Sequence, residues 1–350
     1  MTQDPGVLAR QTAEQLAEDG VGAVVAAVVD GRAEIRGAGR VASDRPDVPG
    51  ADTLFEIGSV TKVFTALCLA RLAVAGTVDL DEPLAGLLPE GTVVPSREGA
   101  EITLRHLATH TSGLPRLPKG MLLRTRLRPN APDPYARCTA RVLLRGLART
   151  RLDARPGARF QYSNLGAGLL GLALARRAGT DYPSLVRREV CAPLGLADTV
   201  VTVGADRADR LARGHDGDGR PTRPWHLADL AGAGALRSTA SDLVTFVLAQ
   251  WDASGPLAEA VRLSRETRHP TGPSSWAHLG WVGHRPDPRQ GGRPQIWHNG
   301  GTGGFSSFVG FDPDRRTAVV ALANTRSPVD AAAARLLATL QTGHAAPARP

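Results

Sequence analysis

The stretch Phe55-Glu56-Ile57-Gly58-Ser59-Val60-Thr61-Lys62 places a serine three residues before a lysine, where an apolar helical pattern begins. The chain has 42 Lys and Arg side chains, and only Lys62 and Lys119 are lysines. A lysine retained among so many arginines suggests a task that arginine cannot perform, because a desolvated ammonium can lose its proton and a guanidinium cannot. A serine with such an amine one helical turn away forms a nucleophile with its own base.

The surrounding residues predict a helix over 59–75. Gly58 lets the chain turn sharply into this helix, so that Ser59 lies in its first turn, where N–H groups and the helix dipole favour a developing anion. The alternative is a plain helix start with a surface lysine. The motif by itself does not separate the two interpretations.

Composition limits the classes of partner. A chain of 350 residues can bury a large core in one large or two intimate domains. The net charge of +8 comes from scattered arginines, and with few aromatic residues and no recognisable nucleic-acid motif we expect a solvated surface and no nucleic-acid partner. The three cysteines, Cys68, Cys138 and Cys191, lack metal-ligand or redox spacing and are expected to be buried apolar residues.

The N-terminus, Met1-Thr2-Gln3-Asp4-Pro5, has neither a basic flank nor an apolar signal core. No apolar run reaches the length of about 18 residues that spans a bilayer. We therefore expect a cytoplasmic protein that does not contact membranes.

Strand patterns lie at both ends of the chain and helical patterns lie between them. Residues 21–29 and 33–36 flank Asp30-Gly31, and residues 308–311 and 317–322 flank Asp312-Pro313-Asp314-Arg315, so each pair predicts a hairpin. Helices are expected over 8–18, 103–109, 139–149, 165–177, 182–190 and 329–340, the last capped by Ser327-Pro328.

This order predicts an α+β fold, with an antiparallel sheet built from both chain ends and flanked by helices. The sheet domain would comprise residues 1–80 and 231–345, and a mostly helical domain of residues 81–230 would be inserted into it. The active site is expected in the cleft between them.

Two further stretches carry candidate chemistry. Gln161-Tyr162-Ser163-Asn164 precedes a helix; a tyrosine beside a lysine can be held as phenolate or can relay a proton, and an asparagine amide can bind a substrate. The alternative for this stretch is an ordinary helix cap.

The second stretch is rich in glycine and runs Trp297-His298-Asn299-Gly300-Gly301-Thr302-Gly303-Gly304-Phe305. Its glycines indicate close approach of another backbone, and the stretch could supply an oxyanion-binding N–H. Its alternative is a glycine-rich connection with an ordinary, partly buried histidine.

Together these motifs resemble the serine β-lactamase and penicillin-binding-protein superfamily, in particular its class C β-lactamase, esterase and D-aminopeptidase branch. Ser59-Val60-Thr61-Lys62 matches S-x-x-K, Tyr162-Ser163-Asn164 matches Y-x-N, and His298-Asn299-Gly300 matches the histidine form of K-T-G. Residues 107–115 and 238–243 are similar to connecting stretches of the family. The resemblance runs from about residue 20 to residue 325.

The resemblance implies a role for each matched residue. Ser59 would form an acyl-enzyme, Lys62 would activate it, and Tyr162 would pass protons; which of the last two is the primary base is left open. The oxyanion would lie between the N–H groups of Ser59 and Gly301. Asn164 would contact the acyl side of the substrate, and His298, Asn299 and Gly300 would belong to the oxyanion- and substrate-binding residues.

The third motif departs from K-T-G. A lysine there would present a fixed charge to a substrate carboxylate, whereas His298 is a weaker, pH-dependent charge. This departure argues against β-lactams and cell-wall peptides and favours ester, amide or thioester substrates.

Other residues allow more than one interpretation. His106 and His110 have the i, i+4 spacing of a helical metal site, but no acidic third ligand is evident, so we expect a structural role and neither a metal ion nor a cofactor. Residues 115–137 are expected to be either a lid over the cleft or a plain surface loop. Trp225 and Trp276 either line a pocket or pack in the core.

Three functions remain open. The first is a serine hydrolase that cleaves a small ester or amide. The second is an acyltransferase in natural-product assembly, which passes the same acyl group to an amine or alcohol acceptor and needs a second pocket that excludes water. The third is a non-catalytic sensor that is acylated without turnover.

Overall fold

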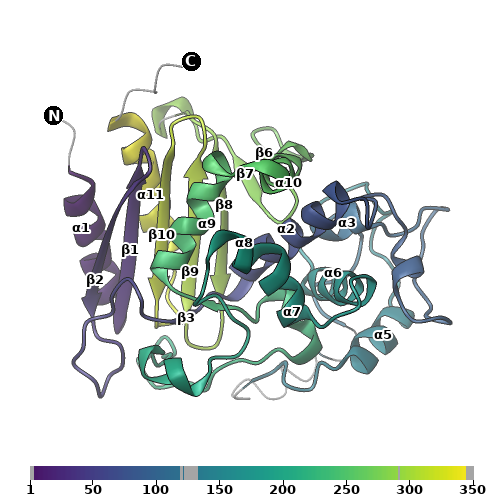
Figure 1. Cartoon of the computed structure of the whole chain (residues 1–350), viewed down its shortest axis with the longest axis horizontal. Coiled ribbons are helices and arrows are strands. Elements are labelled where there is room, and N and C mark those ends of the chain that lie inside the picture. Colours follow the sequence, from purple (N-terminus) through teal and green to yellow (C-terminus); the bar gives the residue numbers. More distant parts are fainter. Residues whose placement is uncertain (1–3, 119–120, 122–132, 291, 344–350) are drawn as a thin grey trace.

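The computed structural model describes residues 4–118, 121, 133–290 and 292–343. Among them, eight strands form one antiparallel sheet in the order β2-β1-β10-β9-β8-β7-β6-β5 (Figure 1). The strands are β1 (Gly22–Val29), β2 (Arg32–Gly39), β5 (His269–Gly272), β6 (Ser275–Ala277), β7 (Val282–His284), β8 (Gln295–Gly301), β9 (Ser306–Asp312) and β10 (Thr317–Ala323). β3 (Phe55–Glu56) and β4 (Arg237–Ser238) form a separate short ladder.

The centre of the sheet joins the two ends of the chain. β1 pairs with β10 over its length, with Val25 opposite Ala321. Both predicted hairpins are confirmed: β1 turns into β2 through Asp30-Gly31, where both residues have positive φ, and β9 turns into β10 after Asp312. Positive φ at both positions matches the twist of a two-residue hairpin turn.

Helices cover both faces of the sheet (Figure 1). On one face, Ala23, Val25 and Ala27 pack in a cluster with α1 (Pro5–Glu18) and α11 (Asp330–Gly343). On the other face, the alternate residues Val24 and Ala26 join the larger core with α2 (Thr61–Val74) and α9 (Ala240–Asp252). Because both faces are buried, β1 is apolar along its whole length, and the predicted α+β class is confirmed.

The middle of the chain is helical. Its elements are η2 (Leu84–Leu87), α3 (Leu104–Ala108), α5 (Ala140–Ala148), α6 (Asn164–Arg177), α7 (Tyr182–Val186), the π-turn η3 (Arg187–Cys191), α8 (Ala192–Leu194), η4 (Ala205–Arg210) and η5 (Ala228–Ala233). α10 (Gly255–Glu266) leads into β5, and η6 (Pro288–Gln290) lies between β7 and β8. The larger core is continuous from strand residues to helices of the middle region, so the proposed domain boundaries stay a prediction.

Two expected boundaries differ from the structure. The helix expected over 59–75 is divided into a 3₁₀ turn, η1 (Gly58–Val60), and α2. The final helix begins at Asp330, so Val329 stands at the N-cap position, and Ser327 and Pro328 precede the places predicted for them.

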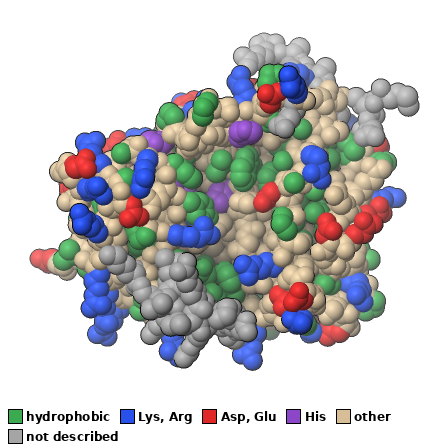
Figure 2. All heavy atoms as spheres, turned by 180° about the vertical axis from the view of Figure 1, so that it is seen from behind, with side chains coloured by type: hydrophobic (Ala, Val, Ile, Leu, Met, Phe, Trp, Pro, Cys, Tyr) green, Lys and Arg blue, Asp and Glu red, His purple; other side chains and the backbone are tan. Residues whose placement is uncertain are grey.

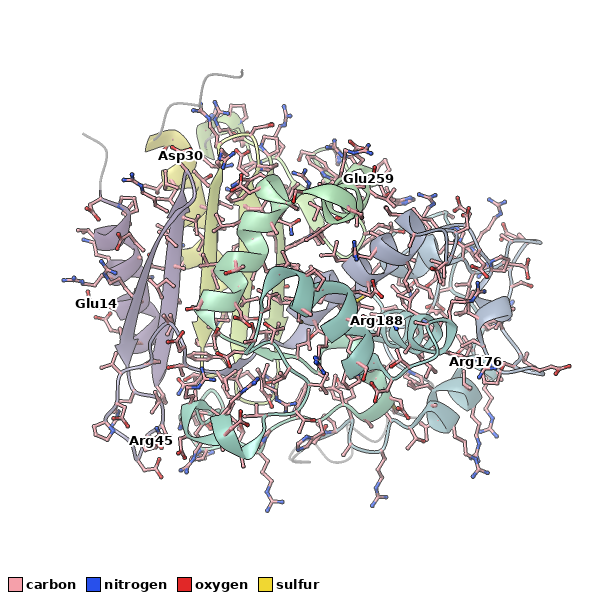
Figure 3. All side chains as sticks on the ribbon, viewed as in Figure 1. Glu14, Asp30, Arg45, Arg176, Arg188 and Glu259 are labelled. Atoms are coloured by element: carbon pink, nitrogen blue, oxygen red, sulfur yellow. The ribbon has the colours of Figure 1, made fainter. Side chains whose placement is uncertain are left out.

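Charged side chains are dispersed over the surface. Figure 2 shows Lys and Arg side chains scattered among acidic and apolar ones on the face that it views. The charged residues labelled in Figure 3 lie on helices and in connecting segments, from Glu14 on α1 to Glu259 on α10. Within the part of the chain that the structure describes, no helix combines the length and apolar character needed to cross a bilayer. The cytoplasmic location stays a prediction.

Candidate active site

Ser59 lies in η1, directly against the last residues of β8. Gly58 has a φ of 48°, and a Cβ built on it would lie 2.7 Å from the backbone nitrogen of Gly301. A Cβ on Gly300 would lie 2.1 Å from the carbonyl oxygen of Ile57 and 2.9 Å from the nitrogen of Ser59. The glycines therefore permit backbone contact between η1 and β8, as their abundance before the β run indicated.

Lys62 is buried beside Ser59. Its side chain is 2% exposed, and Nζ lies 2.9 Å from the Ser59 Oγ and 2.6 Å from the carbonyl oxygen of Ala233, to which it donates. No acidic side chain forms an ion pair with it among the described residues. Burial lowers the pKa of Lys62 well below its usual value, and the Arg116 guanidinium lowers it further. A neutral amine at this position can accept the Ser59 proton.

The Ala233 carbonyl is held in place from behind. The Thr65 hydroxyl, one turn after Lys62 on α2, donates to the carbonyl of Gly232 at 2.9 Å and contacts the Tyr182 hydroxyl at 2.7 Å. The bond to Gly232 joins η5 to α2 and so holds the neighbouring Ala233 carbonyl, which orients the lysine amine.

Tyr162 stands on the other side of the lysine. Lys62 Nζ lies 4.9 Å from the centre of the Tyr162 ring, and the Arg116 guanidinium carbon lies 5.2 Å from it. Burial raises the pKa of the phenol, although a hydrogen bond with Ser59 and the charge of Arg116 act in the opposite direction. A resting phenolate, one of the two roles expected for Tyr162, is therefore wrong, and a neutral phenol that relays protons agrees with the pKa.

A cavity of about 530 Å³ opens in front of Ser59. Residues of both expected domains line it: Gly58, Ser59, Arg116, Tyr135, Tyr162, Asn164, Trp225, Leu227, Leu230, Ala233, Gly234, Asn299, Gly300, Gly301, Thr302 and Arg326. The cavity is thus lined from both regions of the sequence, while the division into two domains stays a prediction. The Asn164 Oδ1 is buried and has no partner among the described residues, so it is available to a substrate donor.

His298 does not supply a charge to this cavity. Its ring is 2% exposed, and burial together with the charge of Lys62 lowers its pKa to about 3. Its Nδ1 lies 2.6 Å from the carbonyl oxygen of Asn299. The expectation that His298 acts as a weak substrate-facing cation is wrong, because burial keeps the imidazole neutral at physiological pH.

Asn299 is also engaged elsewhere. Its Nδ2 donates to Asp330 Oδ2 at 3.0 Å and so ties the end of β8 to α11. Gly300 and Gly301 line the cavity with their backbone atoms alone, since glycine has no side chain.

The positive charges at the cavity are arginines that the sequence did not single out. Arg116 follows Pro115, and Arg326 follows the end of β10; both side chains are exposed. Neither guanidinium forms an ion pair with any described residue. Their approach depends on tertiary folding, since 209 positions separate them in the sequence.

A buried ion pair supports the aromatic wall of the cavity. Arg237 donates to Glu56 at 2.9 Å, and both side chains are 4% exposed. The Trp225 N–H donates to Glu56 at 2.8 Å, and the Trp225 carbonyl accepts from Arg237. The Trp225 ring then packs edge-on against Tyr135 at 5.1 Å. Trp225 lines the cavity, whereas Trp276 lies on β6 beside His278.

The two histidines considered as metal ligands have separate environments. His106 takes part in the capping box that begins α3, while His110 lies beyond the end of that helix with a φ of 57°. Among the described residues, no group of three or more His, Cys, Asp or Glu side chains is arranged to hold a metal ion. The three cysteines are buried and unpaired.

Most of the expected lid lies outside the described residues, namely 119–120 and 122–132, and the lid therefore stays a prediction. Arg116 and Tyr135, on its two flanks, line the cavity.

Comparisons with known proteins agree with this architecture. The family model described as "Beta-lactamase" matches residues 9–343. The D-alanyl-D-alanine-carboxypeptidase/endopeptidase AmpH of Escherichia coli K12 is 31% identical over 318 residues, which cover 86% of this chain and 79% of that protein.

Solved structures are similar over nearly the whole chain. A β-lactamase/D-alanine carboxypeptidase from Yersinia pestis, complexed with citrate, is 26% identical with a TM-score of 0.79, covering 97% of each chain. A class C β-lactamase from Rhodobacter sphaeroides is 26% identical with a TM-score of 0.81, covering 96% of this chain and 98% of that one. The sequence match across residues 9–343 and the shared fold together establish that the chain belongs to the β-lactamase family of serine hydrolases.

Proposed function

We propose that the protein is a serine acyl-enzyme hydrolase that cleaves a small ester or amide carrying an anionic group. The observation that carries the proposal is the buried Lys62 amine, 2.9 Å from the Ser59 Oγ and without an acidic partner among the described residues. A lysine in this environment is a base, because burial disfavours its charged form.

The reaction proceeds in two halves. Lys62 takes the Ser59 proton while Oγ forms a bond to the substrate carbonyl carbon. The C–O or C–N bond then breaks, and the leaving group takes a proton from Lys62 directly or through Tyr162. Water next attacks the acyl-enzyme, gives up a proton along the same route, and releases the acid and a regenerated Ser59.

The oxyanion is proposed to lie between the N–H groups of Ser59 and Gly301. Support comes from the close packing of η1 on β8, in which Gly58 and Gly300 allow the two backbones to come into contact. Preorganised N–H groups stabilise charge that develops in the transition state, and each donor is worth about 10²–10³ in rate.

The anionic group is proposed from Arg116 and Arg326. These two cations line the cavity and have no ion-pair partner in the described part of the chain. With His298 in place of a lysine, the third motif offers no fixed cation to a substrate carboxylate. Arginines that enter the cavity from other segments can bind that carboxylate instead, so D-alanyl peptides and β-lactams, which the names of the relatives suggest, belong among the candidate substrates.

The test uses matched chromogenic esters whose acyl groups are neutral or end in a carboxylate, together with a chromogenic cephalosporin and a D-alanyl-D-alanine peptide. We expect a covalent acyl adduct on Ser59 by mass spectrometry, and a higher kcat/KM for the carboxylate ester by about tenfold. Ser59→Ala should abolish both adduct and turnover.

Arg116→Gln and Arg326→Gln should remove the preference for the carboxylate ester. Turnover that survives Ser59→Ala would refute the acyl-enzyme. Equal rates for the two esters would refute the anionic requirement.

Acyl transfer remains the second candidate, because it shares the acyl-enzyme. The favouring observation is the size of the cavity, about 530 Å³, with Tyr135 and Trp225 as an aromatic wall beyond the reacting serine. Repeating the assay with an added amine or alcohol separates the two functions: a transferase yields the amide or ester product, whereas a hydrolase yields the free acid.

A further inference from the structure

His110 occupies a costly backbone conformation behind Tyr162. It is 6% exposed and has a φ of 57°, in the left-handed region that non-glycine residues seldom adopt. Such a conformation is strained and persists where surrounding contacts over-determine it. The contacts of His110 therefore indicate what the conformation achieves.

These contacts converge on one short segment. The His110 carbonyl accepts the N–H of Gln161 at 2.7 Å, and its Nδ1 accepts the N–H of Ser163 at 3.2 Å. Between these two bonds, the imidazole packs against the Tyr162 ring with 4.5 Å between ring centres. His110 thus holds Gln161, Tyr162 and Ser163 by a backbone hydrogen bond, a ring contact and a side-chain hydrogen bond, respectively.

The segment is secured on its far side as well. The Ser163 hydroxyl donates to the carbonyl of Pro115 at 2.7 Å and accepts the N–H of Gly166 at 2.9 Å, which caps α6. The Tyr162 backbone is therefore fixed between His110 and the start of α6.

We propose that His110 is the positioning residue of Tyr162: through the Ser163 N–H bond and the ring contact it sets the direction in which the phenol points at Ser59. This inference rests on the proposed function, because positioning matters only if Tyr162 relays protons. His110 itself touches no reacting atom. Orientation of this kind has large kinetic effects, since misplacement by about 1 Å can cost 10²-fold in rate.

The bond to Ser163 requires an unprotonated Nδ1. The groups that face the imidazole are Lys62, His298, Arg116 and the neutral phenol of Tyr162. Burial is the main cause that lowers the pKa of His110 well below its usual value, and the three basic groups lower it further. The neutral tautomer with its proton on Nε2 is the one compatible with the bond.

Two substitutions separate positioning from simple packing. Asparagine places its Oδ1 near the position of the histidine Nδ1 and tolerates a positive φ, so His110→Asn can still accept from Ser163. Glutamine has the longer side chain, and His110→Gln places its acceptor near the former Nε2. Both variants lose the ring, so a difference between them reports on the bond to Ser163.

The kinetic experiment measures kcat and KM of both variants on the chromogenic ester, at equal folded fractions by circular dichroism. His110→Gln should lower kcat by about 10- to 100-fold with KM changed by less than about threefold, and His110→Asn should recover at least about tenfold of that loss. Equal kcat values for the two variants, or a loss confined to KM, would overturn the proposal.

A second readout does not depend on activity. Amide exchange at Ser163, followed by NMR, should accelerate by about fivefold or more in His110→Gln and remain near the wild-type rate in His110→Asn. Unchanged exchange in His110→Gln would overturn the proposed clamp. If the wild type turns over none of the esters, the proposed function fails, and the exchange experiment still decides whether His110 holds this segment.

Discussion

Acid should destabilise the folded protein through His298, and replacing this residue should relieve the effect. The imidazole is buried beside Lys62, and its pKa is lowered to about 3 from the usual value of 6.5. In the unfolded chain the same group binds a proton as the pH falls through about 6.5. Between these two pH values the unfolded state holds one proton more, so the free energy of unfolding decreases with acidification.

The magnitude follows from the width of this window. At about pH 4.5 the solution lies about two pH units below the unfolded pKa and still above the folded one. Each pH unit corresponds to 1.36 kcal/mol, so His298 should cost the wild type about 2–3 kcal/mol relative to pH 7.5. The full window down to about pH 3 corresponds to about 4–5 kcal/mol.

The assay is urea unfolding of the wild type and His298→Asn at pH 7.5 and 4.5, followed by tryptophan fluorescence. Asparagine keeps a donor near the position of Nδ1, which lies 2.6 Å from the Asn299 carbonyl. Other buried histidines, such as His278 with a pKa of about 4, contribute equally to the loss of unfolding free energy in both proteins. The loss between the two pH values should therefore be smaller in His298→Asn by about 2–3 kcal/mol.

His226 provides the matched control, because its side chain is exposed. His226→Asn should lose as much stability on acidification as the wild type. An equally large loss of stability in His298→Asn would show that the wild-type imidazole takes up its proton in the folded state, contrary to its lowered pKa.

Three further predictions follow from the site. Lys62→Arg should lower kcat/KM by at least about 10²-fold, because the charge is kept but the removable proton is lost; near-normal kinetics would exclude Lys62 as a base. Arg237→Met should destabilise the protein by about 3–5 kcal/mol in urea unfolding, because it leaves Glu56 buried without its partner. Adding Glu56→Gln to this variant should recover part of the lost unfolding free energy. If the losses of the two single variants simply add in the double variant, the pairing is contradicted. Gly300→Ala should separate β8 from η1 and reduce kcat, because the added Cβ would lie 2.1 Å from a carbonyl oxygen. The control Gly86→Ala, with open space around it, should behave as the wild type. Equal activity of the two variants would show that the contact between β8 and η1 is dispensable.

Local sequence patterns predicted much of the fold. The Asp30-Gly31 turn and the apolar run of β1 were recognisable because both depend on residues close together in the chain. The Ser59–Lys62 pair was recognisable for the same reason, since one turn of helix brings i and i+3 together.

Long-range contacts were not predictable in this way. His110, Arg116 and Arg326 reach Tyr162 or the cavity from separate segments. Neither the spacing of His110 to His106 nor its place in the family-like stretch 107–115 indicates its contact with Tyr162, and the end of α3 at Ala108 interrupts the helical spacing of the two histidines. Nothing near Arg326 in the sequence distinguishes it from the other arginines.

The sequence by itself determined that Lys62 stands one turn from a serine at the start of a helix, because that distance follows from helix geometry alone. Only the tertiary structure decided the charges of the site. Burial lowers the pKa of Lys62 and keeps His298 and Tyr162 neutral, and the two arginines provide the positive charge that His298 does not. The physical reason is that a pKa depends on solvent access and on neighbouring charges, and both are set by residues far apart in the chain.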